Sequence, residues 1–131
     1  MIIRRGALSL ISGALLIVGF SALSGQAEAR TFTTTTSFGF FFGSPDAFLG
    51  QVSSNNNANC RKHRLVKVFR KLSSGQRQVG RDVANATGQW EINLADVPAA
   101  RYYALVPKKS FGPGRRHACR AYRSSILNFG G

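Results

Sequence analysis

The hexapeptide Gln89-Trp90-Glu91-Ile92-Asn93-Leu94 decides the fold of this chain. Its apolar residues Trp90, Ile92 and Leu94 alternate with polar ones. Successive side chains of a β-strand point to opposite faces, so all three apolar groups fall on one face. The pattern predicts a half-buried strand that places Trp90 in the core, since a lone tryptophan in such a pattern is typically buried.

Short segments of the same kind lie on both sides of this strand. Val66 and Val68 share one face of the segment 64–71, and turn-forming residues precede and follow the segment 78–83. We expect about seven strands, at residues 48–53, 64–71, 78–83, 90–94, 102–106, 119–124 and 125–129. Because no amphipathic helix interrupts them, the chain is predicted to be all-β. An antiparallel two-sheet sandwich over residues 47–131 fits better than a barrel or a mixed fold.

The first 29 residues predict a secretory signal peptide. Arg4 and Arg5 give a positively charged start, residues 7–23 carry no charge, and Ala27-Glu28-Ala29 offers the small-x-small pattern of a cleavage site. An uncleaved membrane anchor is the alternative, because the apolar run approaches the roughly 20 residues that span a bilayer. The serines and glycines within the run favour cleavage. We therefore expect an exported protein, either secreted or held in the periplasm or cell envelope, that begins at Arg30.

Residues 30–46, which we call the leader, are rich in Thr, Phe and Gly. Thr33–Thr36 is a run of threonines, and four phenylalanines follow it within the segment 37–43. Threonine and phenylalanine favour extended backbone, whereas the glycines and Pro45 disfavour a helix. The composition predicts a mostly flexible leader, with an added edge strand or a docking segment as the alternatives.

The chain has two cysteines, Cys60 and Cys119. Export exposes them to an oxidising compartment, and two cysteines allow one internal pairing. Such a disulfide closes a loop of about 60 residues and should stabilise the fold by roughly 4 kcal/mol. The alternative is a metal site that includes His63 or His117. The basic residues around both pairs would repel a cation, so we predict a disulfide and neither a metal nor a cofactor.

The charge is strongly positive, with 18 Lys and Arg against 5 Asp and Glu. Removal of residues 1–29 takes away two basic residues and one acidic residue, which leaves 16 against 4. Such a chain attracts polyanions. A disulfide would also bring together the basic runs beside each cysteine, because bonded Cα atoms lie about 4.4–6.8 Å apart. The predicted anion-binding residues are Arg61, Lys62, Arg64, Lys108, Lys109, Arg115 and Arg116. A solvated face without a ligand is the plainer alternative.

Four segments resemble parts of carboxypeptidase-regulatory-like domains, which share the transthyretin-like (prealbumin-type) sandwich; the first, second and fourth resemble strands of the family, and the third resembles its signature turn. They are Phe48–Ser53, Val66–Arg70, Val79–Ile92 and Tyr102–Val106. The resemblance implies a small secreted bacterial protein, with cysteines in matching places, that acts as a non-catalytic accessory or binding module. The sequence departs from the family at Pro98-Ala99-Ala100-Arg101, where a glycine usually follows the proline, so a tight turn is not expected there.

No group of residues in the chain suggests catalysis. The acidic and histidine residues show no paired spacing, and the serines lack the context of an activated nucleophile. We predict an exported, non-enzymatic binding or accessory module whose basic patch engages an anionic partner. Candidate partners are a wall polymer, lipid headgroups, an acidic polysaccharide and extracellular nucleic acid. The alternative is a structural or assembly protein that docks through the Phe-rich leader, with its charge incidental.

Overall fold

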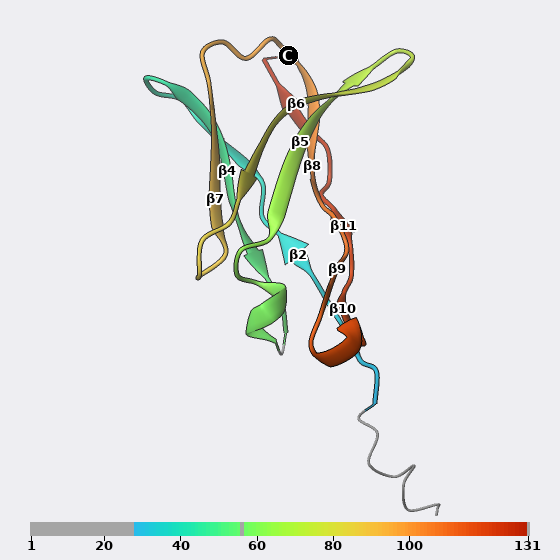
Figure 1. Ribbon diagram of the computed structural model, residues 1–131. Helices are drawn as coiled ribbons and strands as arrows, with labels where there is room; N and C mark the ends of the chain where they lie inside the picture. The colour runs from blue at the N-terminus through green and yellow to red at the C-terminus, as the bar shows by residue number, and fades with distance from the viewer. Residues whose placement is uncertain (1–27, 56, 131) are drawn as a thin grey trace, which may run out of the picture.

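The computed structural model describes residues 28–55 and 57–130, so residues 1–27 of the predicted signal peptide lie outside the described part. Within that part the regular elements are strands, apart from the single 3-10 turns η1 (Ala58–Cys60) and η2 (Pro113–Arg115). Two sheets built from antiparallel pairs face each other (Figure 1). The prediction of an all-β sandwich is therefore confirmed.

The first sheet is built around β4 (Asp46–Ser53). Strand β7 (Gln89–Leu94) pairs along one side of β4, with Ile92 opposite Phe48 and Trp90 opposite Gly50. The short strands β2 (Thr35–Thr36) and β3 (Gly39–Phe41) pair with the two halves of β4 along its other side. This sheet therefore uses residues from the predicted leader.

The second sheet is built around the antiparallel pair β5 (Leu65–Leu72) and β8 (Ala100–Val106). Strand β6 (Gly75–Val83) forms a hairpin with β5 and is one edge of the sheet. Two short strands, β11 (Tyr122–Arg123) and β12 (Leu127–Phe129), pair with β8 at the other edge.

A smaller three-stranded sheet closes one end of the sandwich. It consists of β1 (Thr31–Phe32), β10 (His117–Cys119) and β9 (Lys109–Phe111), with β1 parallel to β10. In Figure 1 this sheet lies at the lower end of the molecule together with η1 and η2, whereas the C-terminus lies at the upper end. The strands predicted from the sequence leave residues 107–118 unassigned, so β9 was missed, because its three residues are too few for a recognisable alternation.

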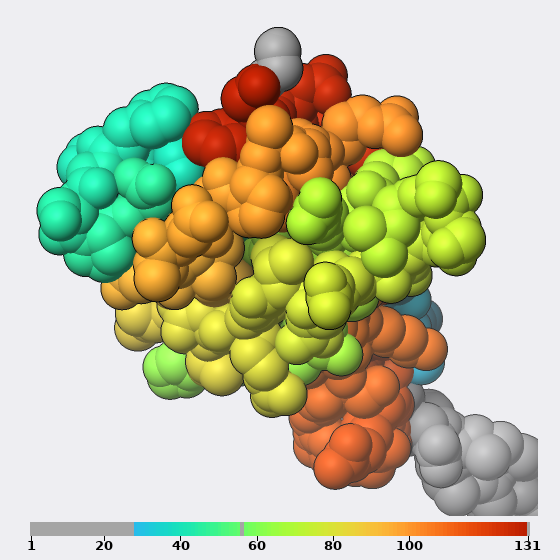
Figure 2. Space-filling model, turned by 90° about the horizontal axis from the view of Figure 1, so that it is seen from above, coloured from blue at the N-terminus to red at the C-terminus, as the bar shows by residue number. Residues whose placement is uncertain are grey.

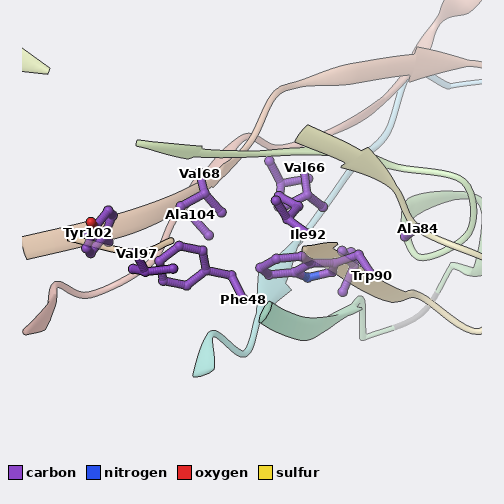
Figure 3. Packing of buried hydrophobic residues seen from close by; sticks show 11 residues of the cluster. Phe48, Val66, Val68, Ala84, Trp90, Ile92, Val97, Tyr102 and Ala104 are labelled. Carbon is purple, nitrogen blue, oxygen red and sulfur yellow. The ribbon is translucent and has the colours of Figure 1, made fainter. Parts of the chain in front are cut away.

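The core lies between the two larger sheets (Figure 3). The first sheet contributes Phe48, Trp90 and Ile92, and they face valines of β5 and the buried residues of β8. Trp90 is 3% exposed, which confirms its predicted place in the core. Its indole Nε1 donates a hydrogen bond to Thr36 Oγ1 at 2.9 Å, so the one polar atom of the ring is satisfied.

The prediction of a flexible leader is wrong for the strand-forming residues 31–41. Thr34 and Thr36 are buried, and Phe38 stacks on Trp90 with ring centroids 6.1 Å apart. A methyl group added at Gly50 would collide with the Ser37 carbonyl, so the backbone of this segment lies tightly against β4. The segment fills the free edge of β4, where its backbone groups find hydrogen-bond partners and its alternate phenylalanines meet the core.

Replacing Thr36 with valine tests this correction. The change removes the acceptor of the buried Trp90 N–H while keeping the shape of the side chain, so we expect the free energy of unfolding to fall by about 1–3 kcal/mol. Thr35→Val is the matched control, because Thr35 is exposed on the other face of the same strand. Denaturant unfolding that gives equal midpoints for the two variants would contradict the placement of residues 31–41 in the folded domain.

Candidate anion-binding site

The predicted disulfide between Cys60 and Cys119 is present and joins the end of η1 to β10. The two Cα atoms are 5.4 Å apart, and both cysteines are fully buried. Each sulfur is bonded to the other, so neither is available as the thiolate ligand that the alternative metal site needs. The bond fixes the loop after η1 beside the small sheet at the lower end of the sandwich (Figure 1).

Basic residues from both sides of this bond meet at that end. The Lys109 ammonium donates a hydrogen bond to the carbonyl of Asn59 at 3.3 Å, which links β9 directly to the residue before Cys60. We call the group of basic residues around the disulfide the cationic end. Its members with exposed or half-exposed side chains are Lys62, Lys108, Lys109, Arg115, Arg116 and Arg120.

Arg61 and Arg120 directly follow the two bonded cysteines. Arg61 is half-buried, and its aliphatic stem lies against Gly88, where an added Cβ would come within 2.9 Å of Arg61 Cγ. It therefore borders the turn before β7. Arg120 was missed by sequence analysis, although it directly follows Cys119 and lines the same end of the molecule as Lys108.

The prediction that Arg64 binds a ligand at the surface is wrong, because its side chain is only 1% exposed. Its Nη1 donates to Thr34 Oγ1 at 3.0 Å and to the Cys60 carbonyl at 2.8 Å. Its Nη2 donates to the carbonyls of Pro107, at 2.8 Å, and Arg120, at 3.4 Å. The planar guanidinium presents several donors in one fork, so a single side chain can connect four separate segments.

These four acceptors are all uncharged, so the hydrogen bonds of Arg64 bury a positive charge at the cationic end against neutral partners. Burial lowers the pKa of Arg64, but a guanidinium stays protonated in proteins. The pKa of Lys109 is lowered as well, first by burial and then by the positive charges of Arg64 and Lys62. An anion bound here would relieve this repulsion.

Two acidic residues have hydrogen-bond partners away from the cationic end. Asp46 accepts a hydrogen bond from the Gly43 amide, and Asp82 accepts one from the Glu91 amide between β6 and β7. A hollow of about 540 Å³ lies away from the disulfide and is lined by residues that include Asp82 and Glu91. Its acidic lining suits an anion poorly, so size does not identify the candidate site.

Two smaller open hollows lie at the cationic end. The first, of about 370 Å³, is lined mainly by basic residues and includes His63, Arg64, Lys108, Lys109, Ser110 and Arg115. The second, of about 390 Å³, is lined by residues that include Thr31, Lys108 and Arg120. Lys108 lines both, so the two hollows adjoin at this side chain.

Comparisons with protein families, curated proteins and solved structures find no match for this chain. The resemblance to carboxypeptidase-regulatory-like domains therefore stays a prediction. In residues 28–55 and 57–130, no helix has both the length and the apolar character needed to span a membrane. The disulfide fits an extracellular location, because such bonds persist in oxidising compartments.

Proposed function

We propose that this protein is an exported, non-enzymatic binding module that attaches to an anionic polymer through its cationic end. One observation carries the proposal. The disulfide gathers Lys62, Lys109 and Arg115 from separate segments around the buried charge of Arg64, and the hydrogen-bond acceptors of that charge are neutral. Positive charges held this close repel one another, and a bound polyanion offsets that repulsion.

The shape of the surface favours a polymer over a single small ion. The two basic hollows share Lys108, so successive charges of a chain can occupy them in turn. A wall polymer, an acidic polysaccharide and extracellular nucleic acid all present charges in this way. Binding of this kind depends on charge and weakens steeply as the salt concentration rises.

Reversing three charges at the cationic end tests this function. We expect Lys62→Glu, Lys108→Glu and Arg115→Glu together to weaken binding to immobilised long-chain polyphosphate by at least about tenfold, and to lower the slope of log affinity against log salt by about 2. The matched control carries Arg77→Glu, Arg81→Glu and Arg101→Glu, which change the net charge equally at exposed positions. An equal loss in both variants would show that only net charge matters, contrary to the proposal.

Assembly through aromatic contacts is a second candidate function, supported by Phe41 and Phe42, which are 56% and 71% exposed. Figure 2 shows this part of the chain, in turquoise, standing out from the body next to the dark red C-terminal segment. We expect Phe41→Ser with Phe42→Ser to leave polyphosphate binding unchanged. If the double variant instead loses retention on the native envelope at both low and high salt, the assembly function is supported over the proposed one.

A further inference from the structure

We propose that the hollow beside Lys109 is a subsite for one phosphoryl group of the polymer. This inference rests on the proposed function and specifies its ligand. The hollow is lined by Lys108, Lys109 and Arg115, with His63 from the loop after η1 at the same opening. It therefore draws its basic groups from three different segments of the chain.

The arrangement of these groups favours phosphate over carboxylate. A carboxylate presents two oxygens in one plane and is matched by the fork of a single arginine. A phosphoryl group presents its oxygens in a tetrahedron, so several point charges placed around it can each meet one. Lys109 begins β9 and Lys108 directly precedes it, whereas Arg115 belongs to η2, so the lining draws its charges from separate elements.

Lys109 is the residue on which the subsite depends. Its ammonium has three donors, and the 3.3 Å hydrogen bond to the Asn59 carbonyl is longer than the roughly 2.7–2.9 Å usual for a strong charge-assisted bond. The side chain is half-buried, unlike exposed lysines whose charge is screened by water. Burial and the charges of Arg64 and Lys62 lower the pKa of Lys109, and a phosphoryl group in contact with the ammonium would oppose that shift.

The floor of the hollow is held in place by Arg64. Its guanidinium donates hydrogen bonds to the carbonyls of Cys60 and Pro107, and Pro107 also lines the hollow. Arg64 is buried and its hydrogen bonds go to the protein, so it acts on the ligand through its charge. The subsite is thereby positioned before a ligand arrives, which lowers the entropic cost of binding.

The test is a titration of the protein with inorganic phosphate at constant ionic strength, followed by amide chemical shifts in NMR spectra. We expect saturable shifts around residues 108–116 with phosphate, and weaker or no saturation with acetate, whose two oxygens lie in one plane. Lys109→Gln should weaken phosphate binding by at least about tenfold, since it removes a charge-assisted contact. Lys71→Gln, on β5, is the matched control and should bind as the wild type does.

The melting temperature of Lys109→Gln shows whether the variant folds. The folded-state pKa of Lys109 lies below its ordinary value, so the unfolded chain binds this proton more readily than the folded one. Near neutral pH the charge therefore opposes folding, and a glutamine should keep or raise the melting temperature. A folded Lys109→Gln variant with unchanged phosphate affinity would overturn the subsite.

The outcomes separate the subsite from the proposed function. If Lys109→Gln keeps its affinity for phosphate while the three charge reversals still abolish polyphosphate binding, the subsite is wrong and the polymer-binding function stands. If the wild-type protein binds neither phosphate nor polyphosphate, both fail. Stronger competition for the hollow by phosphatidic acid vesicles than by polyphosphate would assign the phosphoryl group to a lipid and overturn its assignment to a polymer.

Discussion

Replacing Arg64 with methionine is expected to lower the free energy of unfolding by about 3 kcal/mol or more. Methionine fills a similar apolar volume but donates no hydrogen bond. The carbonyls of Cys60 and Pro107 and the hydroxyl of Thr34 then lose a donor at 2.8–3.0 Å. Each buried acceptor left without a partner costs about 1–3 kcal/mol, and the effects accumulate because a single side chain serves them all.

Two further substitutions show whether the hydrogen bonds or the charge matter. Arg64→Lys keeps the charge but replaces the planar fork by a single ammonium, so it should recover only part of the loss. Arg101→Met removes an exposed arginine and should change stability by no more than about 0.5 kcal/mol. Denaturant unfolding with the disulfide intact measures all three. A loss below about 1 kcal/mol for Arg64→Met would contradict the role that we assign to Arg64.

The burial of Arg64 could have been predicted from the alternation of residues in its strand, although its charge favoured a surface position. Arg64 lies two and four residues before Val66 and Val68, so the period-2 pattern that places these valines in the core places Arg64 on the same face. Its acceptors come from residues 34, 60, 107 and 120, which the chain brings together only after folding. The face could therefore be predicted from the sequence, but the partners that make burial tolerable could not.

The short strands of the leader could not be predicted from the sequence. Strands β5 and β7 are eight and six residues long, and each alternates clearly enough to be predicted. Strands β2 and β3 contain two and three residues, too few to show a period. Their formation depends on the free edge of β4, which is a long-range partner. The proximity of the two basic runs could be predicted for a different reason. A disulfide fixes the distance between its two cysteines, and so between the residues beside them, even when the surrounding strands are not predicted.

Removal of the disulfide by Cys60→Ala and Cys119→Ala is expected to lower the free energy of unfolding by roughly 4 kcal/mol. The cysteines are 59 residues apart, so their bond removes much conformational freedom from the unfolded chain. Alanine is preferred to serine because both positions are fully buried, and a serine hydroxyl would need a new partner. Measurement is by denaturant unfolding of the double variant beside the oxidised wild-type protein.

The same variant should also bind polyphosphate more weakly, because Lys62 and Lys109 are no longer held together across the bond. Combining the loss of the disulfide with Arg64→Met gives a further test. Its guanidinium donates a hydrogen bond to the Cys60 carbonyl, so the disulfide and Arg64 hold the same loop. Loss of both should cost less than the sum of the separate losses, with a coupling energy of about 0.5–3 kcal/mol. Strict additivity would mean that the disulfide and Arg64 stabilise independent parts of the molecule, and the cationic end would then not be a single unit.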